Sequence, residues 1–86
     1  MKKITARATL SVMTDNYADH ILSAIGQVDT KNVAVQTDAL GTTFTGEQDA
    51  VFSAVYALFH AANDGKTHLN MHIQLSANSP TKTTNL

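Results

Sequence analysis

Histidine is the residue type in this sequence with the widest chemical range, because it titrates near neutral pH and binds metal ions. Of the four histidines, His68 and His72 lie in one alternating segment, where an extended chain separates them by about 13 Å. A single metal ion cannot take both as ligands within one chain. His20 and His60 fall in two different predicted helices, with no acidic residue at a matching spacing. We therefore expect neither a metal site nor a cofactor.

The sequence also lacks the motifs that mark a catalytic centre. It contains no cysteine, which excludes disulfides, thiolate nucleophiles and thiolate metal sites. It has neither the glycine pattern of a nucleophile elbow nor a glycine-rich phosphate loop. Serine, histidine and aspartate are all present, but nothing in their spacing brings them together. The sequence therefore predicts that the protein is not an enzyme.

Neutral hydrogen-bonding side chains are the remaining candidates, and they alternate with apolar residues in two segments. Such strict alternation predicts strands with one buried face and one open face. On the open face, residues 4–12 and 68–76 would place Thr5, Arg7, Thr9, Ser11, His68, Asn70, His72 and Gln74. Two strands predicted at residues 33–38 and 42–45 form a hairpin. They would add Gln36, Asp38 and one set of threonines, either Thr43 and Thr45 or Thr42.

Two segments with a helical period of apolar residues separate these strands. Thr14 is predicted to cap the first helix, whose apolar stripe runs to about residue 28. The second helix is predicted to open at Thr45 or at the next residue, because Thr45 and Gln48 have the spacing of a capping box. Gly65 is predicted to end it as the C′ residue.

The predicted order of elements is β-α-β-β-α-β, the arrangement of the ferredoxin-like sandwich. This is an α+β fold in which two helices cover one face of an antiparallel four-stranded sheet. We expect a single ligand-binding domain at residues 1–77. Residues 78–86 are mostly Ser, Thr, Asn and Lys around a proline, which favours a flexible tail.

The open face of the sheet has two interpretations. A solvated face normally carries more Lys and Glu than this one, which favours a ligand surface, a dimer interface or both. The alternative is a plain solvated face, because threonine is a good strand former and is tolerated there.

Composition limits the partners of this face. Six basic residues against seven acidic ones leave a net charge of −1, with no basic run to bind a phosphate backbone. Nucleic acid is therefore not an expected partner. No segment has the apolar length of a signal peptide or a membrane span, so we predict a cytoplasmic protein without membrane insertion. At 86 residues the domain buries a limited core, and association with a second copy would stabilise it.

The order and spacing of several short segments resemble those of a known family over roughly residues 4–80. The segments are Met13-Thr14-Asp15, residues 28–33, Gln36-Thr37-Asp38 with Thr42, Gly46 with Val51-Phe52, and His60-Ala61-Ala62 with Gly65. Together they resemble the YkoF-like family of thiamine- and hydroxymethylpyrimidine-binding proteins. Its founding type has two ferredoxin-like units per chain. Since this chain has one, the resemblance implies a homodimer that recreates the pair. The sequence departs from the family pattern at Val12, Thr45 and His72, near the expected pocket.

The resemblance implies binding of thiamine or its hydroxymethylpyrimidine precursor without catalysis, by a carrier or sensor linked to vitamin uptake. Recognition of such a ligand needs a carboxylate, several hydrogen-bonding groups and an apolar wall. Asp38 is the candidate carboxylate, and its alternative role is an Asx-turn before Gly41. The other candidate ligand-binding residues are Thr9, Ser11, Thr37, Thr42, Thr43, Asn70 and His72. The alternative function is a structural or regulatory homodimerisation module that binds no vitamin.

Overall fold

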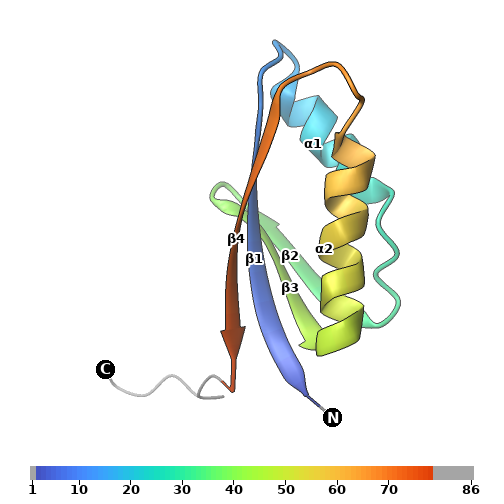
Figure 1. Ribbon diagram of the computed structural model, residues 1–86, viewed down its shortest axis with the longest axis vertical. Coiled ribbons are helices and arrows are strands. Elements are labelled where there is room, and N and C mark those ends of the chain that lie inside the picture. Colours follow the sequence, from blue (N-terminus) through green and yellow to red (C-terminus); the bar gives the residue numbers. More distant parts are fainter. Residues whose placement is uncertain (1, 79–86) are drawn as a thin grey trace.

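The computed structural model describes residues 2–78 and confirms the predicted fold class and element order. Its elements are β1 (Lys3–Val12), α1 (Tyr17–Gly26), β2 (Val33–Asp38), β3 (Gly41–Glu47), α2 (Gln48–Ala62) and β4 (Leu69–Ala77). The strands form an antiparallel sheet in the order β2-β3-β1-β4, and both helices lie on one side of it (Figure 1). Apart from its first residue, the tail predicted at residues 78–86 lies outside the described residues.

The core lies between the two helices and the even-numbered residues of β1. Ala6 and Ala8 are buried there, and the largest fully buried side chains are Phe44, Val51 and Leu58. Ala6 is paired with Phe44 across the sheet, so a small residue lies beside the largest side chain of the core. This alternation of large and small residues lets the helices pack closely on the centre of the sheet.

Helix α1 begins later than the sequence predicts. Asn16, not Thr14, is the N-cap residue, and it makes no side-chain capping bond. The first helical bond runs from the backbone N–H of His20 to the carbonyl of Asn16. The Thr14 N–H instead donates to the Val12 carbonyl in a tight turn that leaves β1. The prediction of a Thr14 cap is therefore wrong, because the chain needs these residues to turn out of the sheet.

Helix α2 also begins later than predicted, at Gln48. Thr45 belongs to β3, where it pairs with Thr5 of β1, so it is not free to form a capping box. The Gln48 N–H donates to the carbonyl of Lys2, outside the helix. The helix ends at Ala62, and Gly65 lies three residues further on with a φ of +80°. Gly65 thus serves the turn before β4 and is not the C′ residue.

Strand β4 lies at one edge of the sheet and extends beyond the cover of the helices. Helix α2 packs on β1, β2 and β3, and α1 packs on β1 and α2. On β4 only the first two helix-facing residues, Leu69 and Met71, pack against the core. Neither described helix is long and apolar enough to cross a membrane.

Candidate functional site

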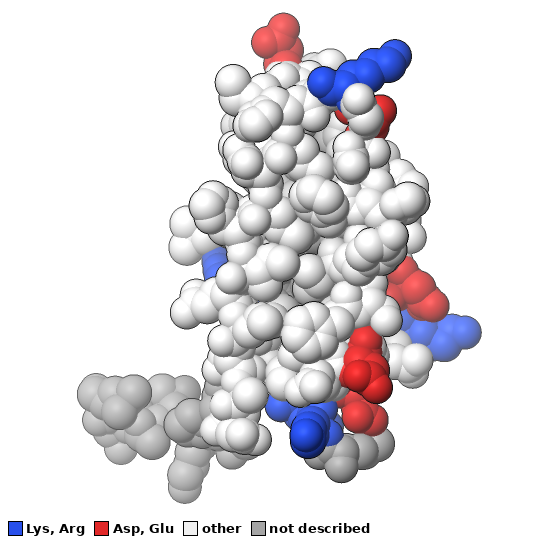
Figure 2. All heavy atoms as spheres, in the orientation of Figure 1, with Lys and Arg blue, Asp and Glu red and all other residues white. Residues whose placement is uncertain are grey.

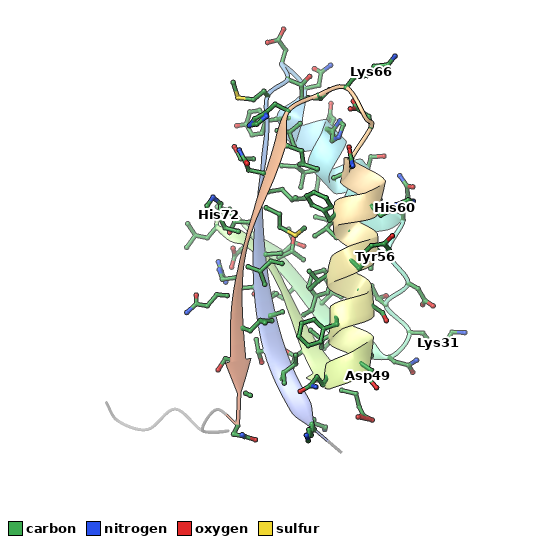
Figure 3. The ribbon with its side chains drawn as sticks, in the orientation of Figure 1. Lys31, Asp49, Tyr56, His60, Lys66 and His72 are labelled. Atoms are coloured by element: carbon green, nitrogen blue, oxygen red, sulfur yellow. The ribbon has the colours of Figure 1, made fainter. Side chains whose placement is uncertain are left out.

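The register of the sheet divides the predicted site residues between its two faces. Arg7 of β1 pairs with Thr43 and with Gln74, which places these side chains on the face opposite the helices. Thr43 and Thr45 are therefore the open-face threonines, and the choice left open by the sequence is resolved. Six of the predicted site residues share this open face, namely Thr9, Ser11, Asp38, Thr43, Asn70 and His72. Figure 3 shows His72 pointing away from the helices.

Thr37 and Thr42 lie on the other side of the sheet, towards the helices. They are paired across the β2–β3 hairpin, and their hydroxyl oxygens are 3.3 Å apart. Thr42 is 3% exposed and is the buried polar residue of the core. The eight predicted residues therefore do not form one cluster.

An ion pair on the open face links β1 to β2 across β3. The Arg7 guanidinium donates to the Thr43 hydroxyl at 3.2 Å and to Asp38 Oδ1 at 3.0 Å. Both ionic side chains are partly exposed, so the pair itself adds little to stability. It fixes the position of the Asp38 carboxylate beside the β2–β3 turn.

Asp38 also holds the turn that follows it. Its Oδ1 accepts the backbone N–H groups of Leu40 at 2.8 Å and Gly41 at 3.1 Å. The Leu40 N–H, with the Arg7 charge and the Gly41 N–H, lowers the pKa of the Asp38 carboxyl below its usual value of 3.8. The Asx-turn role considered from the sequence is therefore present. All these contacts use Oδ1, which ties the carboxylate to the turn and to Arg7.

The β2–β3 turn lies tightly against β1. A Cβ atom on Gly41 would be 2.6 Å from the carbonyl oxygen of Ala8, which requires glycine at this position. The Thr9 hydroxyl donates to the Leu40 carbonyl at 3.0 Å from the β1 side. These contacts hold the turn rigidly next to the start of α1.

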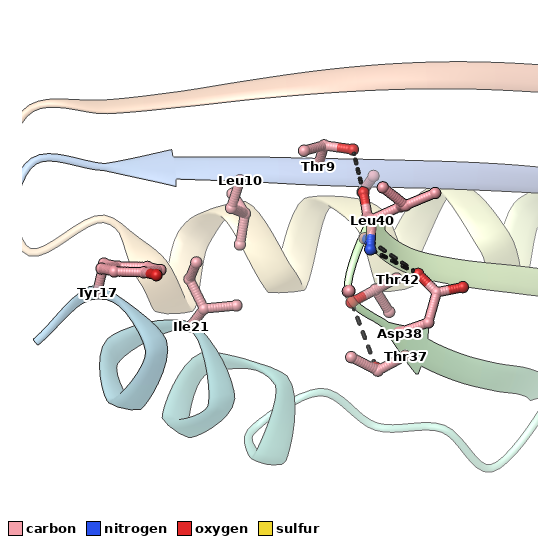
Figure 4. A pocket seen from close by; sticks show the side chains of 11 residues that line it. Thr9, Leu10, Tyr17, Ile21, Thr37, Asp38, Leu40 and Thr42 are labelled. Atoms are coloured by element: carbon pink, nitrogen blue, oxygen red, sulfur yellow. Dashed lines mark hydrogen bonds between the residues drawn. The ribbon is translucent and has the colours of Figure 1, made fainter.

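A pocket of about 170 Å³ lies between this turn and α1 (Figure 4). Its apolar walls include Leu10 of β1, Tyr17 and Ile21 of α1, and Leu40 of the turn. Four of the predicted site residues also line it: Thr9, Thr37, Asp38 and Thr42. A cavity of about 150 Å³ accommodates a benzene-sized ring. The pocket therefore has room for one six-membered heteroaromatic ring.

Sequence reasoning missed the contribution of α1 to this pocket. Tyr17 and Ile21 have the spacing of a core stripe, and that is how the sequence reads them. In the structure Tyr17 is an exposed aromatic at the first turn of α1, facing the hairpin. The signal that could have found it is a large aromatic residue at a helix start, where the fold brings the β2–β3 turn close.

A second hollow, of about 320 Å³, lies between α2 and the segment before β2. It is lined by Asp29, Asn32 and small residues of α2, such as Ala50 and Ala57. None of the predicted site residues reaches it. We assign the candidate site to the smaller pocket, which combines apolar and aromatic walls with hydroxyl groups and a carboxylate.

Three of the histidines, His20, His60 and His68, make contacts that suit structural roles. His20 Nε2 lies 2.7 Å from the Ala62 carbonyl oxygen. His68 Nε2 lies 3.1 Å from the side-chain nitrogen of Asn70. The His60 ring stacks on Tyr56, and both point away from the sheet (Figure 3). Within residues 2–78, no three His, Asp or Glu side chains are close enough to hold a metal ion.

Comparison with known proteins places the chain in a family. Residues 3–82 match the model of the YKOF-related family. The chain belongs to this family. It is 37% identical over 75 residues to the "Putative HMP/thiamine-binding protein YkoF" of Bacillus subtilis strain 168. The match covers 86% of this chain but only 37% of that protein, so the chain spans little more than a third of the length of its relative.

Solved structures with the same fold are more distant in sequence. A domain of unknown function, DUF77, from Bacillus cereus matches 98% of this chain and 84% of its own, with a TM-score of 0.73 and 21% identity. A putative thiamine biosynthesis/salvage protein from Thermotoga maritima matches 83% of this chain and 81% of its own, with a TM-score of 0.62 and 17% identity. At these identities the likeness shows the fold alone.

Proposed function

We propose that this protein binds hydroxymethylpyrimidine, or thiamine through its pyrimidine ring, without transforming it. The observation that carries the proposal is the pocket of about 170 Å³ beside the Asp38 turn, because its size suits one pyrimidine ring. Membership of the YKOF-related family supports this ligand class, since a relative carries thiamine and hydroxymethylpyrimidine in its name. The role that follows is a carrier or sensor linked to vitamin uptake.

The residues around the pocket suggest how an aminopyrimidine would be held. The ring would lie against Tyr17 and Leu40, with Thr37 and Thr42 as hydrogen-bonding partners for its edge. Oδ1 of Asp38 keeps the turn closed, and the carboxylate on the open face would accept a donor from the part of a longer ligand that extends beyond the pocket. Thr9 would position the turn through its bond to the Leu40 carbonyl.

Four other predicted site residues lie outside this pocket: Ser11, Thr43, Asn70 and His72. We keep them as predicted contacts for the rest of a longer ligand or for a second chain on the open face. The unit that acts would be a homodimer of a single domain at residues 1–77, by analogy with the longer relative. A cytoplasmic location stays a prediction of the sequence.

Calorimetric titration with hydroxymethylpyrimidine and with thiamine tests the proposal. We expect binding with a Kd of about 1–100 µM for both ligands, because the shared pyrimidine ring fills the pocket. Replacing Tyr17 by Ala should weaken binding about tenfold or more, and replacing Tyr56 by Ala should not, since Tyr56 points away from the sheet. No heat at millimolar ligand would leave the homodimerisation module as the function.

A further inference from the structure

Two helix-facing residues of β4 are left without a helix to cover them. The alternation of the strand places Ile73 and Leu75 on the helix side, opposite Ala8 and Ala6 of β1. Nevertheless they are 45% and 50% exposed. The reason is that α2 packs over β1, β2 and β3 and does not reach the edge of the sheet. Side chains that the sequence pattern assigns to the core therefore face solvent.

Helix α2 presents apolar side chains on the flank beside them. Phe52 and Phe59 lie seven residues apart, on the flank opposite the Ala50 and Ala57 side that faces β2, and they are 47% and 37% exposed. We call Phe52, Phe59, Ile73 and Leu75 the β4–α2 face. Figure 2 shows this side of the molecule, and its centre carries no charge: the Lys, Arg, Asp and Glu side chains lie at its ends and along its margins.

The backbone edge of β4 lacks the features that keep edge strands from pairing. Over Leu69–Ala77 it has no Lys, Arg, Asp, Glu, Pro or Gly, and it pairs with β1 along its whole length in a regular register. Edge strands that stay unpaired are usually short, charged or broken by proline or a bulge. The opposite edge, β2, is shorter and ends in the charged Asp38. Of the two edges, β4 is the one suited to accept another strand.

We propose that a second copy of this chain pairs with β4 in an antiparallel, two-fold arrangement centred on Ile73. This inference extends the homodimer proposed above by naming its interface. In that register Ile73 lies opposite its own symmetry mate, and Leu75 lies opposite Met71 of the second copy. The apolar face of one strand thus continues the apolar face of the other. Because the strand is uncharged, no like charges oppose each other in self-pairing.

The extent of the β4–α2 face is consistent with a stable dimer. Its four side chains are 37–50% exposed. They would supply part of the roughly 800 Å² per partner that a specific interface buries, and the paired backbone of β4 with its flanking residues would add to it. Pairing would join two sheets into one of eight strands with all four helices on the same side. Phe52 and Phe59 of each copy would then cover the Ile73 and Leu75 pairs at the centre.

Sedimentation of the full chain tests this interface with a matched pair of variants. Leu75→Lys places a charge in the proposed interface, and Leu22→Lys places the same charge at a leucine of α1 that is 59% exposed. We expect the wild type and Leu22→Lys to sediment as dimers, and Leu75→Lys to dissociate with a Kd raised at least about tenfold. Circular dichroism should show that all three remain folded, because neither leucine is buried.

A cross-link gives a positive readout of the register. The chain has no cysteine, so Ile73→Cys introduces a single thiol. Residues directly opposite in an antiparallel pair have Cα atoms about 5 Å apart, which lies within the range that a disulfide spans. Mild oxidation should therefore give a covalent dimer with Ile73→Cys and not with Leu22→Cys.

Three outcomes overturn the proposal: a monomeric wild type, a Leu75→Lys variant that stays dimeric, or an Ile73→Cys variant that does not cross-link. Failure here is distinguishable from failure of ligand binding. Calorimetry on the Leu75→Lys variant measures ligand binding separately from dimer formation, because the pocket lies between α1 and the β2–β3 turn.

Discussion

At the scale of single residues, Asp38 and Asp64 each hold a turn by accepting two backbone N–H groups. Asp38 accepts the N–H groups of Leu40 and Gly41, and Asp64 accepts those of Lys66 and Thr67. The sequence indicated the first of these turns, because an Asp before Gly is typical of an Asx-turn. It did not indicate that the same oxygen pairs with Arg7, since that contact depends on the register of β1 and β3.

Asp64 gives a test of these contacts through pH. The N–H groups of Thr67 and Lys66 and the Thr67 hydroxyl lower the pKa of its carboxyl from 3.8 to about 2. A lowered pKa in the folded state means that the carboxylate stabilises the protein above pH 3.8 and that this stability is lost as the pH falls towards 2. In urea denaturation, Asp64→Asn should lower the midpoint urea concentration at neutral pH. As the pH is lowered from 3.8 to about 2, the midpoint of the variant should decrease less than that of the wild type.

The control for this prediction is Asp15→Asn, a substitution at an exposed residue before α1. It should leave the urea midpoint at neutral pH, and the decrease of that midpoint in acid, close to those of the wild type. If the urea midpoint of Asp64→Asn decreases in acid as much as that of the wild type, the lowered pKa of Asp64 does not cause the loss of stability.

At the scale of elements, the strands could be predicted from the sequence more closely than the helix ends. Alternation defined β1 and β2 to within a residue, because a one-residue slip would bury Arg7 and expose Ala6. The helix starts were placed too early because capping patterns at Thr14 and Thr45 are local. The structure uses these residues in a turn and in β3, and tertiary pairing outweighs a cap of about 1 kcal/mol.

The β2–β3 turn is the element on which the pocket depends, and Gly41 tests it. Gly41→Ala should destabilise the protein by about 1–3 kcal/mol, because the new methyl group meets the Ala8 carbonyl at a φ of +151°. It should also weaken ligand binding, since Leu40 and Asp38 would move. Gly26→Ala is the matched control, because nothing lies within 4 Å of its Cβ position.

In urea denaturation Gly26→Ala should be neutral or stabilise by up to about 1 kcal/mol, since alanine is the better helix former. Equal stability of the two variants would mean that the turn does not press against β1.

At the scale of the whole molecule, residues 2–78 form one layer of helices on one sheet, and within these residues two surfaces have no covering layer. One is the polar open face, which the alternation of the sequence predicted. The other is the β4–α2 face, which the sequence did not predict because Ile73 and Leu75 read as core positions. Ile73 and Leu75 are exposed because α2 packs over the other three strands and not over β4.

A domain of this size is marginally stable alone, so association should be visible in its thermal unfolding. We expect the wild-type Tm to rise by several degrees between about 5 and 500 µM protein, because dilution favours the less stable monomer. The Tm of Leu75→Lys should be lower and should change little with concentration in the same range. Parallel concentration dependence in both proteins would contradict the β4 interface.

Amide chemical-shift mapping tests most directly whether the pocket beside the Asp38 turn binds a pyrimidine ring, as we propose. Titrating the ¹⁵N-labelled chain with hydroxymethylpyrimidine should shift the amides of Tyr17, Thr37, Gly41 and Thr42, which surround the pocket. The amides of Thr5 and Thr45, which pair with each other towards the other end of β1 and β3, should shift little. Shifts centred on Ser11, Asn70 and His72, with none at Tyr17 or Gly41, would contradict the account.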